Sequence, residues 1–142
     1  MITQLMIDYQ EKKHNQLVNI LLNEPQRLGL EEDFILHREK EHELWYEGRV
    51  YVKPDLFFET LRGNIYVEVK SSCSKLCLEK AQSQLFRMAV CLKDLLPDIP
   101  YNLGLAFPRG QHQTVKKMLQ RLEVVIYDPN VNEEEMDYPY YV

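Results

Sequence analysis

Apolar residues recur at helical spacing in two long segments of the chain. The first, residues 1–23, carries Leu5, Met6, Tyr9, Leu17, Val18, Leu21 and Leu22, and Pro25 and Gly29 follow it. The second, residues 75–96, carries Leu78, Ala81, Leu85, Met88, Leu92 and Leu95, and Pro97 and Pro100 follow it. This spacing places each set on one face of a helix, and proline and glycine end helices. The pattern therefore predicts two amphipathic helices.

Between these helices the pattern changes to that of strands. Leu44–Tyr46 is a short apolar run, Val50–Glu59 is rich in Val, Tyr and Phe around Pro54, and residues 65–70 alternate between two faces. Turn residues separate the runs, so we expect a meander of hairpin-linked strands. Proline cannot donate to a strand ladder, which predicts a bulge or a strand edge at Pro54. Residues 31–43 fit either a short helix or a charged edge strand.

The order of elements predicts the fold class. After the second long helix we expect a buried strand at Tyr101–Phe107, a helix at Gln111–Arg121 and a last strand at Leu122–Tyr127. Antiparallel strands followed by a crossover helix and a further strand give an α/β fold with a mixed central sheet and helices on both faces. Residues 1–130 would form a single domain, and residues 131–142 an acidic, Tyr-rich tail, of which residues 133–142 are expected to be loose.

Composition narrows the class of protein. The chain has 142 residues, of which 45% are hydrophobic and 27% charged, as in a soluble globular domain. We expect no membrane span, because no run of about 18 apolar residues occurs. Without a secretory signal at the start, the three cysteines are expected to be reduced thiols of a cytoplasmic protein.

Net charge argues only weakly against a nucleic-acid partner. The formal charge is −5. All 17 Lys and Arg residues lie at or before Arg121, whereas six acids follow it: Glu123, Asp128, Glu133, Glu134, Glu135 and Asp137. The body of the chain is therefore close to neutral, and the acidic excess lies near its end.

Charged residues lie in the middle of predicted strands. Glu68 and Lys70 are two residues apart among Ile, Tyr and Val, so they share a face of their strand. If the preceding hairpin closes with Glu59 opposite Asn64, Asp55 falls directly opposite Glu68. Two facing carboxylates repel unless a cation lies between them, and a strand that served stability alone would not keep them.

This set of side chains suits phosphodiester hydrolysis. Two carboxylates hold Mg²⁺ through oxygen ligands and leave positions for water and phosphate. A bound metal polarises the phosphate and lowers the pKa of its water, and Lys70 would orient that water or stabilise developing charge. The alternative is a surface salt-bridge ladder on an exposed sheet face.

The motif also resembles a known family. Pro54-Asp55, twelve intervening residues and Glu68-Val69-Lys70 are similar to the signature of the PD-(D/E)XK nuclease superfamily, which includes RecB-like and VRR-type nucleases and Holliday-junction resolvases. The resemblance covers residues 53–88 in motif and about residues 5–127 in element order. It implies a restriction-endonuclease-like core in αβββαβ order, plus a further helix and strand. It further implies Asp55, Glu68 and the carbonyl of Val69 as metal ligands, with Lys70 beside the attacking water.

The same resemblance suggests further site residues. Members carry an acidic residue or a histidine on the first helix, for which Glu11 is the first candidate and His14 the second. RecB-like and VRR-type members carry a glutamine on the helix after the Glu-x-Lys strand, which suggests Gln82, with Gln84 as the alternative. An iron–sulfur cluster with four cysteine ligands is not expected, since the chain has three cysteines.

The sequence thus predicts a Mg²⁺-dependent nuclease, with Mn²⁺ able to substitute, that cuts DNA by recognising structure or ends. Such a protein could belong to a phage or mobile element, and a homodimer is compatible with the sequence. A basic patch on the last predicted helix would contact the phosphate backbone: Arg109, Lys116, Lys117 and Arg121. The alternatives are a catalytically inactive DNA-binding or assembly subunit and an unrelated α/β interaction domain. The sequence leaves open DNA or RNA, and endonuclease or exonuclease.

Overall fold

The structure, a computed structural model, describes residues 3–71, 74–108 and 123–136 of the chain. Its long helices are α1 (Gln4–Asn23) and α2 (Lys75–Leu95), and its short 3₁₀ helices are η1 (Pro25–Leu28), η2 (Glu32–Phe34) and η3 (Glu133–Glu135). Its strands are β1 (Ile35–Lys40), β2 (Leu44–Tyr46), β3 (Arg49–Val52), β4 (Leu56–Thr60), β5 (Gly63–Val69), β6 (Tyr101–Ala106) and β7 (Val124–Tyr127).

Both long helices predicted from the apolar stripes are confirmed, and side chains cap their first turns. The Thr3 hydroxyl accepts from the amide of Met6 at 3.3 Å, and the Ser74 hydroxyl accepts from the amide of Cys77 at 3.3 Å. Such caps satisfy amide groups that have no partner within the helix. Pro25 starts η1 directly beyond α1, as expected from its position.

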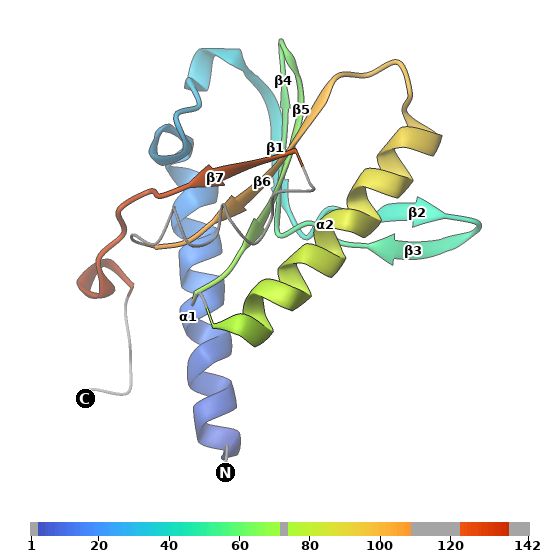
Figure 1. Cartoon of the computed structure of the whole chain (residues 1–142). Coiled ribbons are helices and arrows are strands. Elements are labelled where there is room, and N and C mark those ends of the chain that lie inside the picture. Colours follow the sequence, from blue (N-terminus) through green and yellow to red (C-terminus); the bar gives the residue numbers. More distant parts are fainter. Residues whose placement is uncertain (1–2, 72–73, 109–122, 137–142) are drawn as a thin grey trace.

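The strands form a mixed sheet with helices on both faces, as predicted. The sheet has five strands in the order β1-β4-β5-β6-β7 (Figure 1). Strands β1, β4 and β5 are antiparallel neighbours, whereas β6 and β7 run parallel to β5. Crossover through α2 makes the parallel β5–β6 pair, because two parallel neighbours need a long connection.

Two apolar clusters fill the space between the sheet and its helices. On one face, α1 packs on β4, β5 and β6 through Leu17, Val18, Leu21, Leu56, Phe58, Ile65, Val67, Val69 and Ala106. On the other face, α2 packs on the same sheet through Leu78, Ala81, Leu85, Met88, Leu92, Phe57, Tyr66, Leu103 and Leu105. The period-two alternation of β5 therefore divides its side chains between the two clusters.

The predicted meander is wrong in its connections. Strands β2 and β3 pair only with each other, and β4 pairs instead with β1, which lies in the ambiguous segment 31–43. That segment contains both a short helical turn, η2, and an edge strand, β1. Glu47 and Gly48 have φ of 53° and 80°, which matches a tight hairpin turn between β2 and β3. The physical reason for the separation is the break at Pro54, which lies between β3 and β4 and cannot extend a ladder.

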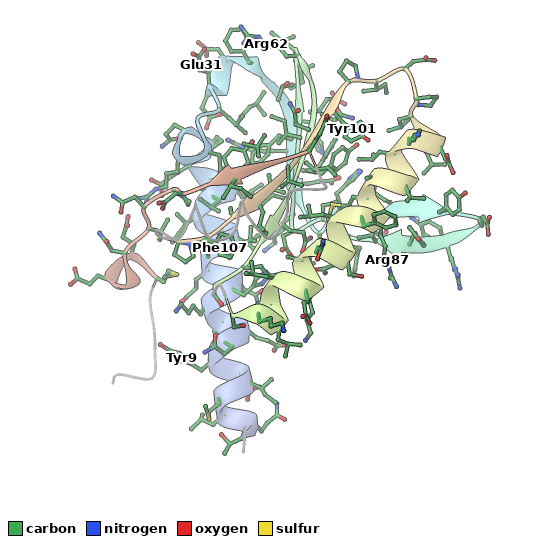
Figure 2. All side chains as sticks on the ribbon, in the orientation of Figure 1. Tyr9, Glu31, Arg62, Arg87, Tyr101 and Phe107 are labelled. Atoms are coloured by element: carbon green, nitrogen blue, oxygen red, sulfur yellow. The ribbon has the colours of Figure 1, made fainter. Side chains whose placement is uncertain are left out.

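The β2–β3 hairpin rests on α2 rather than on the main sheet. The Tyr46 hydroxyl donates to Asp94 at 2.9 Å, and Arg87 extends from α2 toward the hairpin, 5.6 Å from the ring centre of Tyr51 (Figure 2). Hairpin and α2 therefore form one surface beside the sheet.

The remaining predicted elements have mixed outcomes. Strands β6 and β7 confirm the two late strands, although β7 begins at Val124 rather than at Leu122. The helix predicted at Gln111–Arg121 lies outside the described residues. Among the described residues, no helix is long and apolar enough to cross a membrane.

The expectation of a loose end from residue 133 is wrong for residues 133–136, because this part of the chain docks on the domain. Val131 and Met136 are each 1% exposed and belong to the cluster that α1 forms with the sheet. The guanidinium of Arg27 also pairs with the carboxylate of Glu135. The apolar side chains among the acids explain this docking, because burying them offsets the cost of ordering the segment. Residues 137–142 lie outside the described residues.

The docked segment leads to a stability prediction. Met136→Ala should lower the free energy of unfolding by about 2–5 kcal/mol, the cost of truncating a buried methionine. Urea denaturation of the full chain measures this change. The control is Glu134→Ala, since Glu134 is exposed and should change stability by less than about 0.5 kcal/mol. Equal urea midpoints for the two variants would show that residues 131–136 do not dock.

Candidate active site

The β4–β5 hairpin has the register expected from the sequence. Glu59 pairs with Asn64, and the ladder continues to Leu56 opposite Val67. Asp55 and Glu68 therefore lie next to each other just beyond the last pair. The backbone amide of Asp55 donates to Glu68 Oε1 at 3.2 Å. In return, the amide of Val69 donates to Asp55 Oδ2 at 2.8 Å. Each strand thus fixes the carboxylate of the other.

A second backbone contact holds Asp55 from the opposite side. Pro54 is buried at the break between β3 and β4, the strand edge that its chemistry predicts. The amide of Glu41, just after β1, donates to the carbonyl of Asp55 at 3.1 Å. Glu41 has a φ of 54°, a conformation that is uncommon for a residue with a side chain. Asp55 is therefore held between β1 and β5.

Glu68 is the one charged residue that is buried among the described residues, with 1% of its surface exposed. Burial raises the pKa of Glu68 well above its usual value, and the negative charge of Asp55 raises it further. The ammonium of Lys70 opposes this shift, with its Nζ 4.0 Å from Glu68 Oε2. A buried carboxylate in this setting requires a proton or a cation nearby.

The first helix reaches the site through His14. Its Nε2 lies 3.3 Å from Asp55 Oδ2. Hydrogen bonding to Asp55 raises the pKa of His14, against the lowering effect of burial. Glu11, the first candidate from the sequence, is exposed and does not show such a contact. Of the two first-helix candidates, the structure brings His14 to the carboxylates.

In the described part of the chain, no hydrogen bond joins either glutamine candidate of α2 to the carboxylates. Gln82 is exposed, outside the apolar stripe of α2. Gln84, the alternative, is half-buried, and its Oε1 is buried without a hydrogen-bond partner. Arg109, Lys116, Lys117 and Arg121, the predicted phosphate contacts, lie outside the described residues.

A polar cavity of about 280 Å³ adjoins the site, and we call it the α1–β1 cavity. Its wall on α1 includes His14, Asn15 and Asn19, and its other wall includes Lys40, Glu41 and Asp55. Lys40 Nζ donates to Asn19 Oδ1 at 3.1 Å, which joins the two walls. Sequence reasoning missed Lys40, Asn15 and Asn19, because the pairing of β1 with β4 that places Lys40 here was not expected.

The donor set fits a hard divalent cation. Asp55 and Glu68 offer carboxylate oxygens side by side, and Glu68 is buried where its charge is costly. Mg²⁺ is commonly held by one or two carboxylates, with waters and substrate phosphate as the other ligands. Among the residues that the structure describes, no group of three or more His, Cys, Asp or Glu side chains is arranged to hold a metal. The two carboxylates would therefore be the protein's side-chain ligands.

Comparison of the sequence with models of protein families and with curated proteins gave no match. The inference about function consequently depends on the site itself.

Proposed function

We propose that the protein is a metal-dependent nuclease that hydrolyses phosphodiester bonds of DNA. The observation that carries the proposal is the convergence of Asp55, buried Glu68 and Lys70 at the adjoining ends of β4 and β5. Two carboxylates with one ammonium serve a reaction in which a phosphate gains negative charge. Substrate selection would depend on DNA structure or ends rather than on a specific sequence.

Asp55 and Glu68 would hold Mg²⁺ or Mn²⁺ by their carboxylate oxygens, with the carbonyl of Val69 as a further ligand. When bound, the metal lowers the pKa of a water and polarises the scissile phosphate. The amide of Val69 and the imidazole of His14 orient Asp55, while the amide of Asp55 orients Glu68. Such fixed orientation reduces the reorganisation needed at the moment of reaction.

Lys70 has a separate task in this mechanism. Its side chain is only 18% exposed, and its ammonium lies at the edge of the carboxylate pair. From there it can stabilise negative charge on the phosphate or orient the attacking water. The protein atoms that bury Lys70 limit the access of water, and this strengthens the electrostatic effect of its ammonium.

Cleavage assays on single-stranded, duplex, flap and four-way-junction DNA test the proposal. The wild type should cut at least one of these substrates with Mg²⁺ or Mn²⁺ and none with EDTA. Asp55→Ala should lose activity through weakened metal binding, and excess Mn²⁺ should restore part of it. The control is Asp33→Ala, which removes an exposed carboxylate of η2 and should retain activity.

Three results would contradict the nuclease proposal. A wild type that binds DNA but cuts none of it would favour the inactive binding or assembly subunit of the same fold. A wild type that neither binds nor cuts DNA would favour an α/β domain with another function. Activity that persists in Asp55→Ala without added Mn²⁺ would show that the cleavage does not depend on the proposed site.

A further inference from the structure

The α1–β1 cavity has the properties of a subsite for a phosphate. It holds one ammonium, from Lys40, and the two side-chain amides of Asn15 and Asn19. These groups supply hydrogen-bond donors, which phosphate oxygens accept. At about 280 Å³ the cavity lies at the lower end of the range of ordinary small-molecule pockets, roughly 300–1,000 Å³, and it can admit a phosphate with its ester oxygens.

The head group of Lys40 is already in place. The hydrogen bond to Asn19 Oδ1 restrains a side chain that would otherwise sample many rotamers. Asn19 accepts this bond through its oxygen, so its amide hydrogens remain available as donors. Lys40 is the last residue of β1. It pairs with Leu56, which places it beside the start of β4 and next to Asp55.

The cavity is continuous with the proposed metal site, because Asp55 belongs to both. A phosphate in the cavity would therefore neighbour a phosphate at the carboxylate pair. The carboxylates of Glu41 and Asp55 also line the cavity, and they disfavour excess negative charge there. A diester phosphate carries one negative charge, whereas a terminal phosphate carries nearly two at neutral pH. This difference favours an internal phosphate of the strand.

We infer that Lys40 and Asn19 bind the internal backbone phosphate adjacent to the scissile phosphate on the same DNA strand. This inference rests on the proposed nuclease function and names a positioning contact for its substrate. The contact fixes the register of the strand relative to Asp55 and Glu68 and carries no sequence information. A contact of this kind is consistent with a nuclease that selects its DNA substrate by structure rather than by base sequence.

Neutral methylphosphonate linkages placed singly around the cleavage site test the contact. With wild-type protein and Mg²⁺, a neutral linkage at one neighbouring position should slow cleavage by about tenfold, the effect of a lost charged contact. Lys40→Ala should slow cleavage of the unmodified substrate by a similar factor. At that one position the two changes should not add, because both remove the same contact. Lys40→Arg keeps the charge and should retain most of the coupling.

Lys53→Ala is the matched control, because Lys53 is an exposed lysine near Asp55 that does not line the cavity. Its effect should add to that of a neutral linkage at every position. Additive effects of Lys40→Ala at every position would overturn the inference. A dependence of the Lys40 effect on a 5′-terminal phosphate, rather than on an internal linkage, would overturn the internal assignment.

A binding measurement separates this inference from the nuclease proposal. DNA binding is measured in Ca²⁺, a metal that need not support cleavage, at several salt concentrations. Lys40→Ala should reduce the slope of log affinity against log salt concentration by the equivalent of about one phosphate contact. Lys53→Ala should reduce this slope less. If the wild type cut no DNA, this result would still support a phosphate contact at Lys40, whereas the assignment of that phosphate next to a scissile one would fail with the nuclease proposal. Equal slopes for wild type and Lys40→Ala would overturn the inference while the nuclease proposal stood. If the wild type bound no DNA, both would fail.

Discussion

Lys70→Ala is expected to slow DNA cleavage by about 10²–10³-fold and to leave DNA affinity nearly unchanged. The two effects separate because affinity comes from many phosphate contacts, of which one lysine supplies a small part. Catalysis depends on the few groups that meet the transition state. Single-turnover cleavage and equilibrium binding to the same DNA measure the two quantities independently.

Metal dependence distinguishes Lys70 from the carboxylates. Lys70 is not a proposed metal ligand, so excess Mn²⁺ should fail to rescue Lys70→Ala while it partly rescues Asp55→Ala. Lys53→Ala serves as the control, because it removes an exposed lysine outside the carboxylate pair. If Lys70→Ala cut DNA as fast as the wild type, Lys70 would have no catalytic role, even in a protein that is a nuclease.

Local patterns in the sequence were sufficient to predict the central hairpin. The alternation in residues 65–70 and the turn before it determine the register from Glu59 opposite Asn64 to Leu56 opposite Val67. Because a hairpin joins neighbours in sequence, its pairing follows from turn geometry and from which side chains must be buried. The proximity of Asp55 to Glu68 follows from the same register.

Long-range pairing could not be predicted in the same way. The hairpin of β2 and β3 separates β1 from its partner β4, and no pattern within either strand specifies that pairing. Apolar side chains such as Leu44 and Val52 suit the core against α2 as well as they suit a meander. In the sequence, Lys40 was therefore indistinguishable from the other charged residues of segment 31–43, although the fold places it beside Asp55.

The sequence could not decide whether Glu11 or His14 belongs to the site, because the two residues are less than one helical turn apart on α1. Both residues lie on α1 at positions compatible with one face, and a carboxylate is the more frequent expectation for a metal site. Leu17, Val18 and Leu21 determine which part of α1 contacts the sheet, and His14 precedes them by about one turn. Only the position of α1 along the sheet, a tertiary property, brings His14 and not Glu11 to Asp55.

Glu68→Gln should have opposite effects on activity and on the stability of the metal-free protein. The substitution removes a metal ligand, so cleavage should fall by at least about 10²-fold, the upper range for changes that only support a ligand. It also removes a buried negative charge that lies beside Asp55. The amide of glutamine can donate to the Asp55 carboxylate, where the charged Glu68 repels it. At pH above the folded pKa of Glu68, the melting temperature in EDTA should therefore rise, by about 3–5 °C for each kcal/mol gained.

The pH dependence of stability provides an independent measure of the same charge. The folded protein raises the pKa of Glu68 above its unfolded value of about 4.3, so the folded state binds the proton more tightly. In EDTA the stabilisation from this proton is fully present below the unfolded pKa and is lost as pH rises through the folded pKa. Wild-type stability should accordingly fall over this window relative to Glu68→Gln, which has no such proton to lose.

Glu59→Gln is the control, since Glu59 is an exposed acid of the same hairpin. It should change neither the melting temperature in EDTA nor the cleavage rate appreciably. Addition of Mg²⁺ should raise the melting temperature of the wild type and of Glu59→Gln, because a metal that binds only the folded state stabilises it. It should have little effect on Glu68→Gln. If Glu68→Gln instead lowered stability in EDTA and responded to Mg²⁺ like the wild type, Glu68 would be a structural hydrogen-bond acceptor rather than a metal ligand.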